Sequence, residues 1–180
     1  MWAYKNKHSV TSKPPSGFTI VELLIVIVVI GILAAITIVA YNGVQNRAND
    51  TIVQSDMRNL MAKIKEYETV NGALPGTGGS GGITGIGRFS IARGSYTTAQ
   101  HNVYNCVGTG TVSGNTEYGV GGMSKSGKKF MYTSIAGPIE YTGGWTNSTN
   151  ICTGMGLVAG SFTFAYGYDV SSSAWFNWTL

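Results

Sequence analysis

The chain has 180 residues, 43% of them hydrophobic and 11% charged, and its formal net charge is +4. That length leaves room for one modest soluble domain beside a long helix. Three of the 12 basic residues, Lys5, Lys7 and Lys13, lie before an apolar run, so nine basic and eight acidic side chains remain after them. A near-neutral chain of this kind lacks the basic surplus typical of proteins that bind nucleic acid or anionic lipid.

Residues 1–17 form a basic, polar stretch that we interpret as a leader peptide. Two successive prolines at positions 14 and 15 disfavour helix just before Gly17. Gly17 has no side chain to obstruct a protease pocket. These features are compatible with a cut between Gly17 and Phe18, which would remove the leader.

The apolar run at 18–41 follows directly. Between Glu22 and Arg47 there are 24 residues without a formal charge, which as a helix measure about 36 Å and exceed the roughly 30 Å of a bilayer core. A general secretory signal cut near Ala40 is one alternative, but the run is longer than such signals. An uncleaved signal anchor is the other, and it leaves Glu22 unexplained.

Glu22 is the one charge near the start of this run. A carboxylate at membrane depth is costly and is expected to meet a specific partner. A cut after Gly17 would free the amine of Phe18, four residues before Glu22, and this amine could pair with Glu22 of its own chain or of a neighbouring helix. Such a pair would favour assemblies with one particular stagger.

Gly17, Phe18, Thr19, Glu22 and the following apolar residues resemble the class III signal of type IV pilins and pseudopilins. The resemblance implies an α+β, lollipop-like fold, with cleavage by a prepilin peptidase after Gly17 and methylation of Phe18. It also implies that Glu22 guides each subunit into a helical filament of identical subunits. The chain would wait in the cytoplasmic membrane with its N-terminus inside, and pilus assembly machinery would then build it into an extracellular pilus.

One position departs from the family pattern. Many type IVa pilins carry a proline some eight residues after a glycine in this run, whereas here Gly31 is followed at that distance by Val39. Without a proline to remove a backbone donor, the sequence gives less reason to expect unwinding of this helix inside a filament. Gly31 and Gly43 are the remaining candidates for a bend.

The helix is expected to continue over 42–71 as an amphipathic segment. Asn71, Gly72 and Pro75 then end it. Apolar residues with 4, 3, 4, 3 spacing predict one buried face, packed on the chain's own soluble domain. This stripe consists of Val53, Met57, Leu60, Ile64 and Tyr67.

Residues 72–180 are expected to form a glycine-rich β domain, since 23 of the 26 glycines lie there. The segment 76–87 is too rich in glycine for regular structure and is expected to be a flexible loop. β-branched and aromatic runs separated by turn residues predict antiparallel strands. These are Val103–Val107, Thr116–Val120, Lys129–Ile135, Ile139–Thr142, Ile151–Val158, Ser161–Tyr168 and Ala174–Trp178.

Aromatic residues near the C-terminus suggest core packing. Alternation along Phe162, Phe164, Tyr166 and Tyr168 predicts one face of a strand packed on the helix stripe, with residues 163 and 165 facing away. The aromatic side chains at 175, 176 and 178 are likewise expected in the core, and adhesion or subunit contact is the alternative if they are exposed.

Cys106 and Cys152 are the two cysteines, and both follow the membrane run. The lysines of the leader favour a cytoplasmic N-terminus, which places the cysteines on the oxidising side. We expect a disulfide, with two free buried thiols as the alternative. Their spacing from the histidines matches no metal site, so neither a metal nor a cofactor is expected.

No arrangement of residues predicts an enzyme. The acids of the soluble part are widely separated, and His101 is expected to be a solvated loop residue. A turn with Lys125, Lys128 and Lys129 offers weak support for DNA contact.

The preferred hypothesis is a prepilin that polymerises into a type IV pilus for adhesion, twitching motility or DNA uptake. Two alternatives stay open. One is a pseudopilin of a type II secretion or competence system, and the other is a minor or tip pilin that acts as an adhesin.

Overall fold

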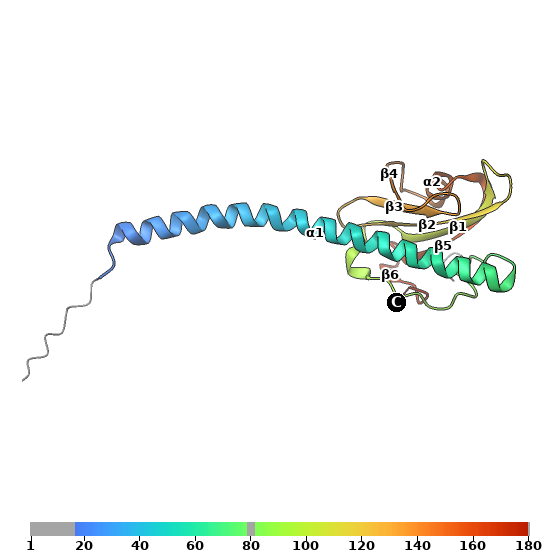
Figure 1. Cartoon of the computed structure of the whole chain (residues 1–180), viewed down its shortest axis with the longest axis horizontal. Coiled ribbons are helices and arrows are strands. Elements are labelled where there is room, and N and C mark those ends of the chain that lie inside the picture. The colour runs from blue at the N-terminus through green and yellow to red at the C-terminus, as the bar shows by residue number, and fades with distance from the viewer. Residues whose placement is uncertain (1–16, 79–81, 180) are drawn as a thin grey trace, which may run out of the picture. The chain divides into compact units, whose positions relative to one another are not determined.

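The structure, a computed structural model, describes residues 17–78 and 82–179 (Figure 1). The leader expected at 1–17 therefore lies outside the described residues, apart from Gly17. The chain divides into two compact units, Met1–Tyr41 and Asn42–Leu180. One helix, α1 (Ile20–Asn71), supplies most of the described part of the first unit and continues into the second.

The second unit contains a six-stranded antiparallel sheet with the strand order β4-β3-β2-β1-β5-β6. This confirms the predicted α+β fold with a long N-terminal helix followed by an antiparallel sheet. The strands are β1 (Asn102–Gly110), β2 (Thr116–Met123), β3 (Lys129–Thr133), β4 (Ile139–Tyr141), β5 (Leu157–Asp169) and β6 (Ala174–Trp175). A short 3₁₀ helix, Arg93–Ser95, lies in the connection between α1 and β1.

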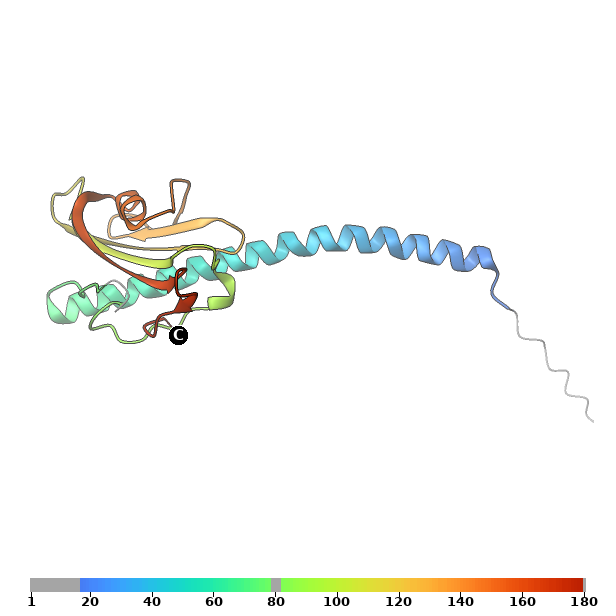
Figure 2. The same ribbon diagram turned by 180° about the vertical axis from the view of Figure 1, so that it is seen from behind.

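The part of α1 within the second unit packs on one face of the sheet (Figures 1 and 2). Four residues of the predicted stripe are fully buried, namely Val53, Met57, Leu60 and Ile64. Met61 joins them, while Tyr67 is half-buried. They share one core cluster with side chains from β1, β2, β3 and β5, so the predicted packing of α1 on the chain's own sheet is confirmed.

Three acidic side chains of α1 add polar contacts beside this stripe. Asp50 accepts a hydrogen bond from the hydroxyl of Ser126. Asp56 accepts from the Tyr96 hydroxyl at 2.9 Å, and Glu68 accepts from the Tyr118 hydroxyl at 3.3 Å. Partial burial, together with the nearby Glu68 carboxylate, raises the pKa of Tyr118 to about 12. Each carboxylate thus accepts from an uncharged hydroxyl group. Because these contacts are not ion pairs, salt should have little effect on the packing of α1 against the rest of the second unit.

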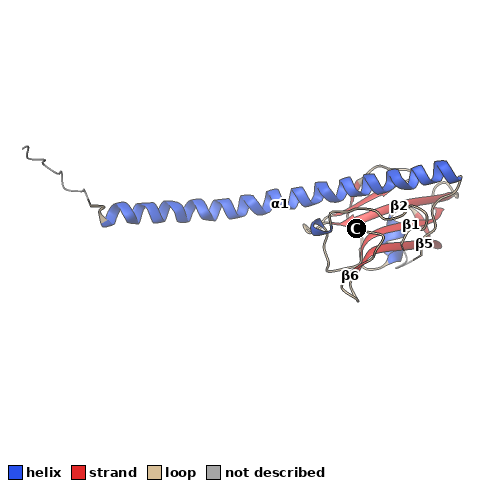
Figure 3. Ribbon diagram, turned by 90° about the horizontal axis from the view of Figure 1, so that it is seen from below, coloured by secondary structure: helices blue, strands red, loops and turns tan. Residues whose placement is uncertain are grey.

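The opposite face of the sheet carries a second core cluster and a second helix, α2 (Ser148–Gly154), which Figure 1 labels across the sheet from α1, whereas Figure 3 shows the sheet from the α1 side. Here Tyr104 and Cys106 of β1 pack with Met131 of β3 and with Cys152 of α2. The sheet is therefore covered on both faces, by α1 on one side and by α2 with its flanking loops on the other.

The predicted orientation of the aromatic ladder in β5 was wrong. Phe162, Phe164 and Tyr166 pack against the cluster on the α2 face, and Ala165 lies in the cluster under α1. Ala165 has no exposed surface. A small side chain fits here because the stripe of α1 already fills this face, whereas the shorter α2 leaves room for rings.

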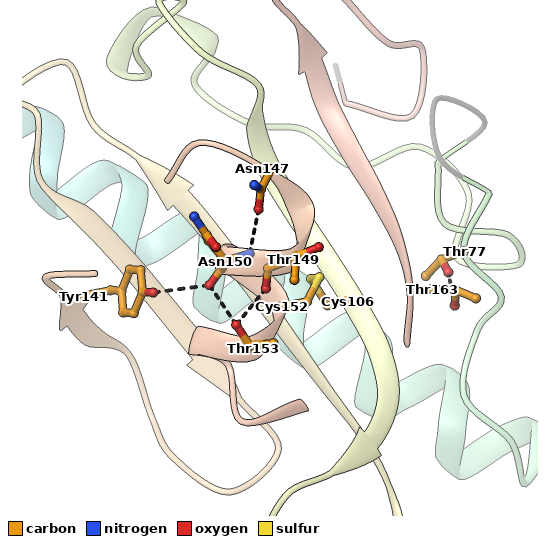
Figure 4. The surroundings of a disulfide bond; sticks show 9 residues. All are labelled: Thr77, Cys106, Tyr141, Asn147, Thr149, Asn150, Cys152, Thr153 and Thr163. Carbon is orange, nitrogen blue, oxygen red and sulfur yellow. Dashed lines mark hydrogen bonds between the residues drawn. A yellow bond between two sulfur atoms is a disulfide. The ribbon is translucent and has the colours of Figure 1, made fainter. Parts of the chain in front are cut away.

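The predicted strand at Ile151–Val158 was also wrong in its first half. Residues Ser148–Gly154 form α2, and β5 begins only at Leu157. The Asn147 side chain accepts a hydrogen bond of 2.8 Å from the backbone N–H of Asn150 and so caps the helix (Figure 4). This cap outweighs the β propensity of the short run after it.

The glycine-rich segment and the C-terminal aromatic residues differ only in detail from the predictions. Thr77 and Ile83 form an isolated bridge at the start of the glycine-rich segment, and residues 79–81 of that segment lie outside the described part. Trp178 is buried as predicted, with 7% of its surface exposed. Trp175 and Phe176 are half-buried against the same cluster.

Candidate functional site

The start of α1 is closed by a reciprocal pair of side chains. The Thr19 hydroxyl accepts a hydrogen bond of 3.2 Å from the backbone N–H of Glu22. In return, Glu22 Oε2 accepts from the backbone N–H of Thr19 at 2.8 Å and from its hydroxyl at 2.7 Å. This is a capping box, which satisfies two of the donors that the first turn of a helix leaves open. It also explains why the helix begins at Ile20 rather than at Phe18.

This geometry gives Glu22 a partner within its own chain. All the hydrogen bonds that it accepts from the described residues go to Oε2, and Oε1 accepts none of them. The carboxylate stands at the positive end of the helix dipole, which favours a negative charge. Oε1 therefore remains available for a further donor from outside residues 17–78 and 82–179.

The residues on either side of the expected cut are open to solvent. Phe18 exposes 84% of its surface. Gly17 is exposed as well, and a side chain placed there would meet nothing within 4 Å. None of the described residues therefore covers the peptide bond between Gly17 and Phe18.

The apolar run forms helix without burying its side chains. From Phe18 to Val44, every large apolar side chain exposes at least 48% of its surface. An 18-residue window of α1 has a mean hydropathy of 3.3 and no buried residue, so the helix is long and apolar enough to cross a membrane. An exposed apolar surface of this length requires lipid or other helices to cover it.

The helix is continuous through the two glycines and through Val39. A side chain at Gly31 or Gly43 would meet nothing within 4 Å. Neither glycine is therefore needed for packing within this chain, which leaves close approach of another helix as a reason for their size.

Comparisons with known proteins single out this same segment. A family profile described as the prokaryotic N-terminal methylation motif matches residues 13–38. The chain is 34% identical to the type II secretion system core protein G of Pseudomonas aeruginosa over 62 residues, which are 34% of this chain and 44% of that protein. It is 42% identical to the type IV wide pilus major component PilA4 of Thermus thermophilus over 55 residues, 31% of this chain and 42% of that one.

These similarities support the type IV pilin and pseudopilin family for this chain. The aligned part of the chain spans less than half the length of either relative. No solved structure matches it. The similarity thus supports the helix and its motif, and the sheet is known from the structure alone.

The two cysteines of the chain form the disulfide that the sequence predicts. Cys106 lies in the central strand β1 and Cys152 in α2, and both are fully buried (Figure 4). The Tyr141 hydroxyl also donates to the carbonyl oxygen of Asn150 in α2, at 3.2 Å. The disulfide and this hydrogen bond attach the short α2 to the sheet.

The lysine cluster considered for DNA contact is largely occupied within the chain. Lys128 Nζ lies 2.8 Å from Glu140 Oε2, and Lys129 Nζ donates to the carbonyl oxygen of Gly143 at 2.7 Å. Two of the three ammonium groups therefore have partners, which weakens the DNA hypothesis.

His101 lies in a loop, as expected, but it is only partly solvated. Its Nδ1 lies 3.3 Å from Asp169 Oδ1, and only 32% of its side chain is exposed. Within residues 17–78 and 82–179, no group of three or more His, Cys, Asp or Glu side chains gathers to hold a metal ion.

Sequence reasoning missed the capping role of Thr19, although the signal was present. The order Thr19, Ile20, Val21, Glu22 before an apolar run is the pattern of a capping box. Glu22 was interpreted as a membrane charge in need of an amine, and the nearer partner was overlooked.

Proposed function

We propose that this chain is a prepilin whose mature form polymerises into a type IV pilus filament. The observation that supports this most directly is Glu22 at the start of an exposed apolar helix, with Oε2 bound by Thr19 and Oε1 without a donor from the described residues. The cap accounts for the position of the carboxylate, and Oε1 leaves a negative charge at membrane depth that a cationic partner would stabilise.

In the proposed sequence of events, a prepilin peptidase cuts between Gly17 and Phe18 and methylates the new amine of Phe18. That amine then pairs with Oε1 of Glu22 in a neighbouring subunit, while Thr19 keeps the carboxylate in place through Oε2. Apolar helices gain little by leaving lipid for one another. The charge pair therefore supplies the register that apolar packing lacks.

The same proposal assigns an orientation. The leader lysines favour a cytoplasmic N-terminus, which places the sheet outside the membrane. The disulfide between Cys106 and Cys152 suits that oxidising side. The pilus assembly machinery would draw the subunit from the membrane into an extracellular filament that serves adhesion, motility or DNA uptake.

A second candidate is a pseudopilin that forms a short assembly in a type II secretion or competence system. The similarity to core protein G of the Pseudomonas aeruginosa secretion system favours it. Electron microscopy of cells separates the two candidates, because a pilin gives long surface filaments and a pseudopilin at its natural level does not.

The test is Glu22→Gln, which removes the charge while its amide oxygen still accepts from Thr19. We expect normal removal of the leader and a large loss of sheared filaments, since the Phe18 amine then lacks a carboxylate. Glu66→Gln is the matched control, because Glu66 is an exposed acid further along the same helix. Wild-type filament yield from Glu22→Gln would contradict the proposal.

A further inference from the structure

His101 and Asp169 join the ends of two neighbouring strands. His101 directly precedes β1 and Asp169 is the last residue of β5, and the pairing of Asn102 with Tyr168 brings them side by side. The distance from His101 Nδ1 to Asp169 Oδ1 is 3.3 Å, and only 14% of the Asp169 side chain is exposed. The imidazole also lies against the Tyr166 ring, with 4.8 Å between centroids.

Asp169 in turn organises the turn between β5 and β6. Its carboxylate accepts hydrogen bonds from the backbone N–H of Ser171 at 3.0 Å, from the Ser171 hydroxyl at 2.7 Å and from the Ser172 hydroxyl at 3.0 Å. Ser173 has a positive φ of 53°, which a residue with a side chain keeps only when its surroundings hold it there. The carboxylate is the group that holds this turn.

The turn and the residues that follow it, 170–179, form a C-terminal segment that packs on the core under α1. Phe176 N–H donates to the Gly167 carbonyl oxygen at 2.8 Å, and the Trp178 indole N–H donates to the Tyr166 carbonyl oxygen at 3.0 Å. Trp178 lies within the core cluster. Whatever loosens the turn therefore loosens the cover over one end of this cluster.

We propose that His101 and Asp169 form a pH-dependent latch, which holds the C-terminal segment more tightly when the imidazole is protonated. His101 Nδ1 has two competing neighbours, Asp169 Oδ1 and the backbone N–H of Val170 at 3.4 Å. A protonated ring donates to the carboxylate in a charge-assisted hydrogen bond. A bare Nδ1 can instead accept from Val170, and the ion pair is then lost.

Among the described groups around the imidazole, Asp169 is the charged one that can pair with it. β5 brings Tyr166 and Asp169 to the imidazole, β1 brings Tyr104 against Tyr166, and the loop before α2 brings the uncharged indole N–H of Trp145 to the His101 carbonyl oxygen. Asp169 is the one ion-pair partner of His101 in the described part of the chain.

The serine hydrogen bonds, with the Ser171 hydroxyl first, hold the pKa of Asp169 below its ordinary value. The carboxylate thus stays ionised throughout the range in which histidine changes charge.

The direction of the effect follows from these charges. The ion pair exists only while the imidazole is protonated, and histidine side chains in general lose that proton as the pH rises. The C-terminal segment then opens more often and exposes Trp178. The latch does not depend on filament formation, so it can be tested on the purified chain.

The test is hydrogen–deuterium exchange of the full-length protein in detergent, at about pH 5 and about pH 8, on either side of the range in which histidine titrates. After correction for intrinsic exchange rates, peptides covering residues 167–179 should open several-fold more often at the higher pH. His101→Gln should remove this difference and resemble the wild type at high pH at both values.

Two further variants make the test specific. Asp169→Asn keeps oxygen and shape but loses the charge, so it should also lose the pH difference. Glu140→Gln breaks the exposed ion pair with Lys128 and should leave the difference unchanged. An equal opening of 167–179 at both pH values in the wild type would overturn the latch, as would a pH difference retained in His101→Gln. If His101→Gln does not fold, the wild-type and Asp169→Asn results decide.

Discussion

The Thr19 hydroxyl and the Glu22 carboxylate hold each other across the first turn of α1, with 2.7 Å between their oxygens. The charge that stands out in the sequence is thus fixed in direction by its own chain before any other subunit approaches. Positioning of the carboxylate and pairing of its charge are separate roles, and they can be tested separately.

Thr19→Val tests the positioning role. Loss of the cap should cost about 1 kcal/mol at the helix start and reduce sheared filament yield, but less than Glu22→Gln does, because the charge remains. Thr19→Ser keeps the hydroxyl and should behave as wild type. The measurement is filament protein per cell, with leader removal checked by electrophoretic size. A loss with Thr19→Val that exceeds the loss with Glu22→Gln would show that capping, and not charge, is the main role of this pair.

Leu60→Ala tests the packing of α1 on the sheet. Leu60 is fully buried in the core cluster, so its truncation should lower the free energy of unfolding by about 2–5 kcal/mol. Lys65→Ala, at an exposed position on the same helix, should change it by no more than about 0.5 kcal/mol. Chemical unfolding of the full chain in detergent, followed by near-UV circular dichroism, measures both. Similar losses for the two variants would contradict the packing described.

Cys106→Ala combined with Cys152→Ala tests the disulfide. The bridge joins α2 to the central strand across 46 residues, and its loss should cost about 2–5 kcal/mol of unfolding free energy. A reductant should lower the stability of the wild type by a similar amount and leave the double variant unchanged. If the reductant destabilised both proteins equally, its effect would not come from this bond.

Asp56 gives a pH dependence of known sign. Burial raises the pKa of its carboxyl, although the hydrogen bonds from Ala92 N–H and the Tyr96 hydroxyl partly oppose this. The folded chain therefore holds this proton more tightly than the unfolded chain does. Its contribution to stability should fall as pH rises from the ordinary aspartate value through the raised one.

Asp56→Asn keeps an acceptor for Tyr96 and should remove that part of the slope of stability against pH. Urea unfolding at a series of acidic pH values measures it. An unchanged slope in Asp56→Asn would show that the carboxyl does not titrate differently in the two states.

Much of the architecture could be predicted from local patterns. The spacing of Val53, Met57, Leu60 and Ile64 identified the buried face of α1, because helical periodicity determines which residues share a face. Met61 was missed because it lies beside that stripe. The sheet is broad and buries a wider face of the helix than the predicted stripe.

The errors come from tertiary choices that local patterns do not contain. Alternation in β5 shows that Phe164 and Tyr166 share a face, but both faces of this sheet are covered, and the pattern cannot say which face is which. For α2, the residues around Ile151 favour a strand, whereas the cap at Asn147 favours a helix. The structure has the helix, which is only one short element long.

The candidate site was predictable in composition and only partly in geometry. Gly17, Phe18 and Glu22 stood out because a glycine and a lone acid lie at the start of a long apolar run. The bond from Thr19 to Glu22 was not anticipated, and its effect is to leave Oε1 for another donor. Pairing of Oε1 with the Phe18 amine of a second copy is the step that we propose.

The most direct test of the central claim is N-terminal sequencing, with mass determination, of the protein sheared from cells. The account predicts that the mature chain begins at Phe18, carries one added methyl group on its amine and retains the disulfide. A product that begins at another residue, or that still carries the lysines of the leader, would contradict it.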